Sequence, residues 1–251
     1  MRLLSSITLA AVLVAALPAA GQVIPGAYQT VIDSPLRPAA DRERDAARHA
    51  AETLAFIGLD PGAAVAEYMP GRGYFTRLLA LAATRDGRVT AYQPAEIVKL
   101  DPTYWTDIQA VAAEPGMRMV TATTGPTAEF ASDGGYDVVF TAQNYHDLHG
   151  PFASEGTAAA FNAAVMKALN PGGLYVVIDH HAVAGSGLKG AGQLHRIDAA
   201  AVRAEIEAAG FVFDGQSDAL ANPDDPLTAM VFDPSIRART SQFMMRFKKP
   251  N

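Results

Sequence analysis

Short apolar runs alternate with helix-forming stretches from residue 63 to residue 210, and this alternation constrains the fold more than any other feature. The runs are AAVAEY, RVTAYQ, MRMVTATT, YDVVFTAQ and LYVVIDHH, which begin at residues 63, 88, 117, 136 and 174. Such runs are typical of strands buried in a parallel sheet. Regular strand–helix alternation favours right-handed crossovers that cover both faces of one sheet. We therefore predict a doubly wound, mostly parallel α/β sheet.

The helical stretches and two late strands complete this prediction. Helices are expected over residues 37–58, 73–83, 95–116 (with a break near Pro102), 157–173 and 199–210. Asp198 has the residue type that caps a helix N-terminus, and Gly210 suits its end. The stretches FVFDGQS and QFMMRFKK, from residues 211 and 242, are expected to pair antiparallel at the sheet edge. The sheet would then have seven strands.

The first residues resemble an export signal. Arg2 precedes an apolar run from Ile7 to Leu17, and small residues follow up to Gly21. This pattern predicts a signal peptide over residues 1–21, because the run is too short to span a bilayer. We expect a lead-in over residues 22–37, one domain over residues 38–251, and a periplasmic or secreted protein.

Composition narrows the range of partners. The chain has no cysteine and a net charge of −6, and its basic residues form no stripe. Binding to nucleic acid is therefore not expected, since that needs a cluster of basic side chains. No second apolar stretch is long enough for a membrane span. The expected partner is a small-molecule substrate.

A glycine-containing turn follows the first apolar run. Glu67 ends this strand, the turn runs from Met69 to Gly73, and Tyr74 begins the next helix. Glycine lets the backbone approach a ligand closely, and a helix N-terminus offers free N–H groups. The turn is therefore a candidate ligand site. Its alternative role is only to reverse the chain.

This turn resembles the first motif of class I S-adenosylmethionine-dependent methyltransferases, in which an acidic residue precedes spaced glycines. Glu67, Gly71 and Gly73 match, and Met69 stands where the first glycine would be. The chain is most similar to a group of secreted, predicted methyltransferases, which have an Asn-x-His-Asp loop after strand four, here NYHD from residue 144. Their C-terminal region is similar to the stretch LHRIDAAAVRAEIEAAGF from residue 194. The resemblance covers roughly residues 40 to 250.

The resemblance implies a Rossmann-like methyltransferase fold, S-adenosylmethionine as cofactor and methyl transfer to a small acceptor. Glu67, Gly71 and Gly73 would line the methionine part of the cofactor. Gln93 takes the place of the acidic residue that holds the ribose hydroxyls. The cofactor-binding residues expected on this basis are Glu67, Pro70, Gly71, Gly73, Tyr74, Gln93, Gln143 and Asn144.

Five histidines and two aspartates follow the last two parallel strands or the loop after them. They are His146, His149, His180, His181, His195, Asp147 and Asp179, and we expect them near one cleft. Three interpretations stay open. A histidine can act as general base, with His146 and Asp147 as the expected catalytic residues. Several can bind a metal, although no complete ligand spacing is present. All can also be structural.

Two weaker features complete the sequence reading. Tyr104 and Trp105 are expected to pack in the core rather than to stack on a ligand. The acidic stretch NPDDP, residues 222–226, lacks a full calcium-loop pattern and is interpreted as a turn. Besides methyl transfer, the chain as a whole has two alternative functions. One is a metal-dependent enzyme on the same fold, and the other is a non-catalytic protein that binds a ligand.

Overall fold

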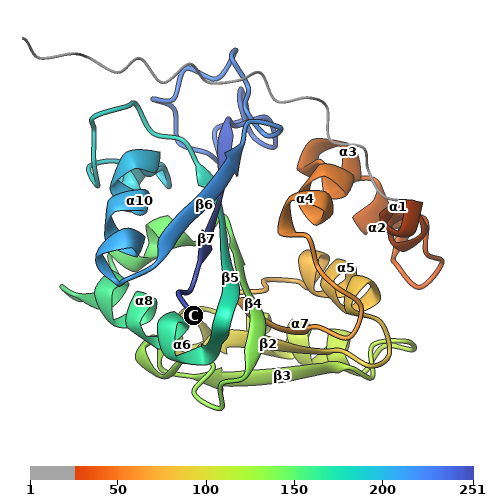
Figure 1. The fold of residues 1–251 in the computed structure, drawn as a ribbon. Coiled ribbons are helices and arrows are strands. Elements are labelled where there is room, and N and C mark those ends of the chain that lie inside the picture. Colours follow the sequence, from red (N-terminus) through yellow and green to blue (C-terminus); the bar gives the residue numbers. More distant parts are fainter. Residues whose placement is uncertain (1–25) are drawn as a thin grey trace, which may run out of the picture.

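The computed structural model describes residues 26–251, and the predicted signal peptide lies outside the described residues. Seven strands form one sheet in the order β3-β2-β1-β4-β5-β7-β6 (Figure 1). The strands are β1 (Ala64–Tyr68), β2 (Arg88–Pro94), β3 (Val120–Gly125), β4 (Tyr136–Ala142), β5 (Leu169–His180), β6 (Val212–Ser217) and β7 (Gln242–Lys248). Strands β1 to β5 pair in parallel, whereas β7 pairs antiparallel with both β5 and β6. The predicted seven-stranded, mostly parallel sheet with an antiparallel pair at one edge is confirmed.

Helices cover both faces of the sheet. They are α1 (Gly26–Ile32), α2 (Ala39–Arg42), α3 (Asp45–Arg48), α4 (Ala50–Ile57), α5 (Tyr74–Ala83), α6 (Ala95–Leu100), α7 (Thr103–Ala112), α8 (Thr157–Ala168), α9 (Ala191–Leu194) and α10 (Ala199–Ala208), with the short 3-10 turns η1 (Thr127–Glu129) and η2 (Tyr145–His149). Asp198 caps α10 as expected, since its carboxylate accepts a hydrogen bond from Ala200 N at 3.0 Å.

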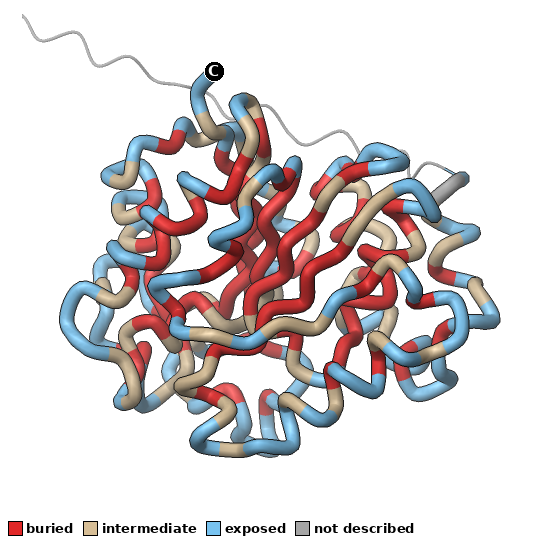
Figure 2. Tube along the Cα trace, turned by 90° about the horizontal axis from the view of Figure 1, so that it is seen from below, coloured by how far each residue is buried: buried red, intermediate tan, exposed pale blue. Residues whose placement is uncertain are grey.

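Alternation along the strands separates two cores. In β1, Val65 packs with α4, α5 and α7, whereas the next residue, Ala66, packs on the opposite face with α8 and α10. Successive strand residues point to opposite faces, so each buried strand contributes to both cores. Figure 2 shows the strands as a continuous buried centre between more exposed helices and loops. The loops at the strand ends therefore extend from a sheet that is packed on both faces.

The prediction of one continuous helix over residues 37–58 is wrong. The chain forms α2, α3 and α4 instead, and His49 between the last two has a left-handed backbone with φ 44°. In the segment before the break, Arg37 Nη1 donates to Asp45 at 2.8 Å, and Arg77 Nη1 of α5 donates to Asp41 at 3.0 Å. The pair between Asp41 and Arg77 joins residues 36 positions apart, so no local pattern predicts it.

Two other boundaries differ from the expectation. Residues 26–32, within the predicted lead-in, form helix α1, which contacts α4 and α5. The helix expected to end at Gly173 ends at Ala168, because the chain from Leu169 already pairs with Tyr136 of β4. No helix in residues 26–251 has the length and apolar character needed to cross a membrane.

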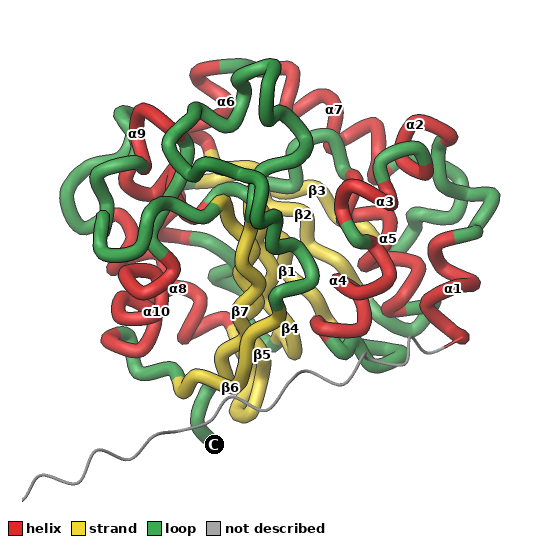
Figure 3. Tube along the Cα trace, turned by 90° about the horizontal axis from the view of Figure 1, so that it is seen from above, coloured by secondary structure: helices red, strands yellow, loops and turns green. Residues whose placement is uncertain are grey.

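The strand order reverses between β1 and β4. Strands β2 and β3 lie on one side of β1, and β4 and β5 lie on the other. Ligands of doubly wound sheets bind outside the carboxyl ends of the strands at this switch point. Figure 3 shows loops and short helices gathered over the sheet, and these include the segments after β1, β4 and β5.

Candidate functional site

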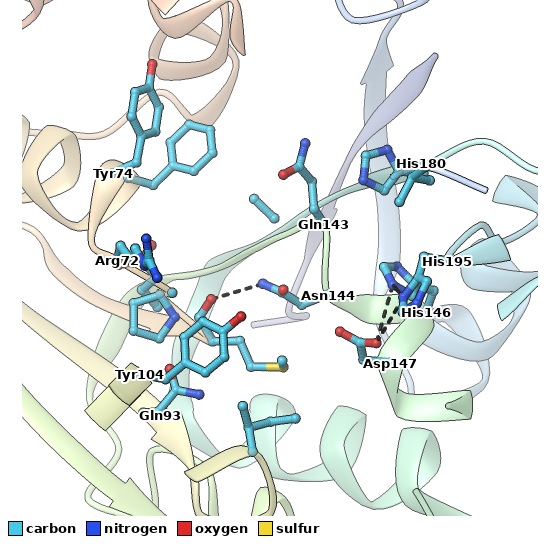
Figure 4. Close-up of a pocket in the computed structure, with 18 of the residues that line it drawn as sticks. Arg72, Tyr74, Gln93, Tyr104, Gln143, Asn144, His146, Asp147, His180 and His195 are labelled. Atoms are coloured by element: carbon cyan, nitrogen blue, oxygen red, sulfur yellow. Dashed lines mark hydrogen bonds and ion pairs between the residues drawn. The ribbon is translucent and has the colours of Figure 1, made fainter. Parts of the chain in front are cut away.

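A cleft of about 430 Å³ lies over the carboxyl ends of β1, β2, β4 and β5. Its lining combines the turn after β1, the end of β2 and the loop after β4 with residues from several other segments. These residues are Arg44, Arg48, Glu67, Met69, Pro70, Gly71, Arg72, Tyr74, Phe75, Gln93, Ile97, Leu100, Tyr104, Ala142, Gln143, Asn144, His146, Asp147, Phe152, His180, His195, Val231 and Phe232. Figure 4 shows Gln93 and Tyr104 on one side of the cleft and the histidines on the other.

The two glycines of the turn after β1 have different roles. Gly71 has φ 57°, lines the cleft, and a Cβ built on it would have no atom within 4 Å. Its surface is therefore bare backbone facing open space. Gly73 has φ 79°, but a Cβ there would lie 2.7 Å from Val111 Cγ2 of α7. Gly73 does not line the cleft, and its lack of a side chain lets α5 pack closely against α7, while its expected contact with the cofactor stays a prediction.

Met69 adopts a conformation that glycine usually supplies. Its φ is 52°, which is unfavourable for a residue with a Cβ. Asn144 Nδ2 donates to Met69 O at 3.0 Å and thereby ties the loop after β4 to the turn after β1. Gln143, beside Asn144, is also left-handed with φ 64°. Strained residues therefore follow both strands of the switch point, where such conformations often accompany function.

Gln93 is buried at the end of β2, with 1% of its surface exposed. Its Oε1 has no hydrogen-bond partner among residues 26–251. A buried amide oxygen without a partner costs roughly 1–3 kcal/mol. Because Gln93 lines the cleft, a ligand hydroxyl or amine within reach would relieve that cost.

Glu67 is buried at the end of β1, and its Oε2 accepts a hydrogen bond from Thr76 Oγ1 at 2.5 Å. Burial raises the pKa of Glu67 to about 7, against the opposing effects of Thr76 and of two arginines, Arg48 and Arg77. The carboxylate of Glu67 is therefore easily protonated near neutral pH. A cationic ligand would favour its ionised form.

Arg48 brings a positive charge to the same end of the cleft. Its guanidinium lies over the rings of Tyr74 and Phe75, at 4.6 and 5.4 Å from their centroids. Its one hydrogen bond to a side chain among the described residues is a long one, 3.4 Å from Nη2 to Gln143 Oε1. Burial and the nearby Arg44 lower the pKa of Arg48. Most of its donors are thus available to an anionic group of a ligand.

His146 is held by a carboxylate behind it. His146 Nδ1 lies 2.8 Å from Asp179 Oδ1, and Asp179 Oδ2 accepts from His146 N at 2.7 Å. Since the carboxylate only accepts, the proton of the neutral ring is on Nδ1 and Nε2 is left with its lone pair. Burial alone would lower the pKa of His146, but Asp179 and Asp147 raise it.

Asp147 and His195 surround the Nε2 atom of His146 (Figure 4). This Nε2 lies 3.1 Å from His195 Nδ1 and 3.3 Å from Asp147 Oδ1, and His195 Nδ1 lies 3.8 Å from the same Oδ1. Burial raises the pKa of Asp147 to about 6. Burial and the proximity of His146 lower the pKa of His195. Two imidazoles and one carboxylate therefore converge on one point of the cleft.

The other histidines have separate roles, so the expectation that five lie at one cleft is wrong. His180 lines the cleft, but its Nδ1 is 2.8 Å from Thr240 Oγ1, and burial lowers its pKa to about 4. His149 does not line the cleft, and its Nε2 lies 3.0 Å from Glu205 Oε2. His181 also lies outside, with its ring against Phe243. The end of β5 places His180 and His181 next to each other in the backbone, but successive side chains point to opposite sides, so only His180 reaches the cleft.

Several lining residues were not expected. Tyr104 borders the cleft rather than the core, whereas Trp105 packs against the core as expected. Phe232 lies against His195, with ring centroids 5.0 Å apart. Arg44 and Arg48 are four residues apart in the predicted helix, a spacing that could have placed both on one helix face. Nothing in the local pattern marks Phe232, which reaches the cleft from a loop late in the chain.

A buried ion pair fixes that late loop beside His195. Arg196 Nη1 and Nη2 each lie 2.9 Å from an oxygen of Asp225, and both side chains are fully buried. Arg196 also donates to the backbone oxygens of Ala229 and His181. The acidic stretch over residues 222–226 is thus an anchored turn, as expected, and it holds the segment that includes Phe232 over the cleft.

No protein-family model and no curated protein matches this chain. Solved structures do share its fold. An S-adenosylmethionine-dependent methyltransferase from Aquifex aeolicus aligns with 79% of this chain and 88% of its own, at 15% identity and a TM-score of 0.54. The glycopeptide N-methyltransferase MtfA complexed with sinefungin aligns over 83% and 87%, at 16% identity and a TM-score of 0.55.

The [4+2]-cyclase SpnF is similar to the same degree, with 18% identity, a TM-score of 0.57, and 84% of this chain and 81% of its own covered. At such low identity these similarities show the fold, which is that of class I S-adenosylmethionine-dependent methyltransferases. Because a cyclase has this fold too, the reaction must be argued from the residues of the cleft.

Proposed function

We propose that the protein binds S-adenosylmethionine in the cleft and transfers its methyl group to a small acceptor. The observation that carries the proposal is Gln93, whose buried Oε1 has no partner among the described residues and lies at the end of β2. A ribose hydroxyl at this position would supply the missing hydrogen bond. The bare backbone of Gly71 on the neighbouring turn leaves room for the rest of the cofactor.

Charge in the cleft supports the same placement. The methionine part of the cofactor carries an ammonium and a carboxylate. Glu67 and Arg48 offer the opposite charges, with Arg48 largely free to donate. We assign Glu67 to the ammonium and Arg48 to the carboxylate. Pro70, Tyr74, Gln143 and Asn144 shape this end of the cleft, with Tyr74 below the arginines and Asn144 tied to Met69.

The adenine is assigned to the apolar side of the cleft. Ile97 and Leu100 of α6 and Tyr104 of α7 line this side, close to the end of β2. A flat aromatic ring gains free energy when it leaves water for such a surface. This arrangement points the sulfonium toward the side that carries His146 and Asp147.

In the proposed reaction, the acceptor's lone pair attacks the methyl carbon while the carbon–sulfur bond breaks with its electrons passing to sulfur. The products are a methylated acceptor and S-adenosylhomocysteine, and the acceptor's proton must leave. We assign His146 and Asp147 to the removal of this proton, because both face the cleft and Asp179 orients the His146 ring. Much of the catalysis would come from alignment of acceptor and methyl group.

Calorimetry with S-adenosylmethionine and S-adenosylhomocysteine tests the cofactor. We expect a Kd within the range typical of enzyme KM values, roughly 1 µM to 1 mM. Gln93→Leu should weaken binding about tenfold, since one hydrogen bond to the ligand is lost. His149→Ala, which lies outside the cleft, is the matched control. Absence of binding by the folded wild-type protein would contradict the proposal.

Methyl transfer itself needs a second assay. Cofactor labelled in its methyl group is incubated with panels of small hydroxyl, thiol and amine compounds, and labelled product is sought by mass spectrometry. Transfer that requires the wild-type residue at position 146 supports the assignment of His146. Product formation at equal rates in wild type and in the double variant His146→Ala, Asp147→Asn would contradict it.

Location belongs to the same proposal. The apolar stretch within residues 1–21 and the resemblance to secreted methyltransferases support export, to the periplasm or outside the cell. Removal of the signal peptide should leave an N-terminus near Gln22. Mass spectrometry of the exported protein tests this, and detection of Met1 in that protein would contradict it.

A further inference from the structure

We propose that His146, Asp147 and His195 bind one divalent transition-metal ion at the acceptor end of the cleft. This inference deepens the proposed function, and its catalytic consequence rests on that function. Metal binding itself does not, because the three side chains form a site with or without the cofactor. The site is built from two elements, since His146 and Asp147 come from η2 and His195 follows α9.

The spacing of the three ligand atoms fits an ion. Zinc and similar ions lie about 2.1 Å from nitrogen and oxygen ligands, which keeps neighbouring ligand atoms about 3.0–3.4 Å apart. The distances from His146 Nε2 are 3.1 Å to His195 Nδ1 and 3.3 Å to Asp147 Oδ1. The third side, His195 Nδ1 to Asp147 Oδ1, is 3.8 Å. A small rotation of His195, whose side chain is 29% exposed, closes it.

The surroundings of His146 match those of a metal ligand. Metal-binding histidines almost always donate their other ring N–H to a carboxylate or a carbonyl, which fixes the ring and directs its lone pair to the ion. Asp179 provides this partner, with its Oδ1 2.8 Å from His146 Nδ1. Asp179 is itself fully buried and accepts from the N–H groups of His146 and His180, so it cannot turn away.

The ligand set indicates the class of metal. Two imidazoles and one carboxylate suit zinc, iron(II) or cobalt(II), whereas magnesium and calcium need several oxygen ligands. The three protein ligands leave at least one coordination position, and the atoms line an open cleft. The remaining position faces the space that we assign to the acceptor.

An ion here would specify the acceptor class. A hydroxyl or thiol bound to the ion has a much lower pKa and loses its proton to water in the cleft. The resulting anion would attack the methyl carbon, and the carbon–sulfur electron pair would pass to sulfur as before. His146 and Asp147 then promote proton removal as ligands of the ion rather than by taking the proton themselves.

Cobalt(II) and zinc titrations of the tag-free protein test the site. We expect one equivalent of cobalt(II) to give the intense visible absorption of a four- or five-coordinate ion, and zinc to displace it. His195→Ala should weaken zinc binding at least 100-fold. Its side chain is on a surface loop, so the variant should fold. Asp179→Asn should weaken binding about 10- to 100-fold. His149→Ala has the same number of histidines as His195→Ala, and it should bind zinc like the wild type.

Two other outcomes would separate failure of the metal site from failure of the proposed function. Zinc affinity that is equal in wild type and His195→Ala, or a cobalt spectrum like that of the ion in water, would overturn the metal site. The three side chains would then only hydrogen-bond one another. S-adenosylhomocysteine binding is measured in the same samples and should change less than about threefold in His195→Ala. Zinc binding without any binding of S-adenosylhomocysteine would support the metal site and contradict the proposed function.

Discussion

Asp179 Oδ1 lies 2.8 Å from His146 Nδ1, and both side chains are buried where β5 and the loop after β4 meet. The same oxygen accepts from His180 N at 2.7 Å. One carboxylate thus joins the ends of β4 and β5 and sets the direction of the His146 ring. The link depends on residues far apart in sequence, and it gives the first prediction.

Asp179→Asn should lower the free energy of unfolding by about 2 kcal/mol, because an amide NH₂ replaces an oxygen that accepts buried hydrogen bonds. Urea denaturation measures the effect. His149→Ala, in which a partly exposed contact to Glu205 is lost, should cost less. A stability change of under about 0.5 kcal/mol in Asp179→Asn would show that the pair does not hold the strand ends together.

Binding of S-adenosylmethionine should strengthen as the pH rises from 6 to 7.5. The pKa of Glu67 is about 7, and the positive ligand favours the ionised carboxylate. Below pH 7 a proton must be displaced before the ligand binds, so the affinity should rise about eightfold from pH 6 to pH 7.5. Calorimetry at several pH values measures it. Glu67→Gln should bind more weakly and lose this dependence, and a steep dependence that survives in Glu67→Gln would assign it to another group.

The raised pKa of Glu67 also makes the stability of the free protein depend on pH. The folded pKa of Glu67 lies above its ordinary value of 4.5, so folding favours the protonated form. Its contribution to stability is therefore full below about pH 4.5 and is lost as the pH rises through 7. Ligand-free Glu67→Gln should keep that stability at pH 8, and thermal unfolding of both proteins at pH 5 and pH 8 checks this.

Met69→Gly should be more stable than Met69→Ala. Both changes remove the same packing beyond Cβ, but only alanine retains the unfavourable left-handed conformation, with φ 52° in the wild type. We expect a difference of about 1 kcal/mol in the free energy of unfolding. In the middle of a helix or strand, a glycine variant is usually less stable than the alanine variant. If Met69→Ala were the more stable variant, the turn would have to relax to another conformation.

The two glycines of the turn should respond differently. Gly71→Val should abolish S-adenosylmethionine binding while the circular-dichroism spectrum stays folded, because the new side chain would occupy the cleft. Gly73→Ala should instead lower stability by about 2 kcal/mol, because its Cβ would meet Val111. Adding Val111→Ala should recover part of that loss. Unchanged binding in Gly71→Val would make the turn purely structural.

Asp225→Asn should lower the free energy of unfolding by about 3–5 kcal/mol, since it leaves the buried Arg196 guanidinium without its counter-charge. Denaturation measures the change. The matched control is Glu207→Gln, which removes an exposed partner of Arg203 and should cost under about 1 kcal/mol. Equal effects of the two changes would mean that water reaches Arg196. Because this pair anchors the loop at Phe232, Asp225→Asn should also weaken cofactor binding.

Much of the fold could be predicted because its signals are local. Apolar runs such as YDVVFTAQ, and the helices between them, depend on neighbouring residues, so alternation was enough to predict the sheet and its two late strands. The turn from Met69 to Gly73 could be located for the same reason. The break at His49 was not predicted, and the segment before it is held in part by a long-range contact, since Asp41 pairs with Arg77, 36 positions away.

The sequence by itself determined which chemical groups follow which strand, and so the positions of Glu67, Gln93, His146 and Asp147 at the carboxyl edge of the sheet. Only the tertiary structure decided which of them face one another. His149 turns toward Glu205, and His195 comes from a later loop to meet His146. Strand order and loop packing bring together residues about 50 positions apart, and no local periodicity encodes such a contact.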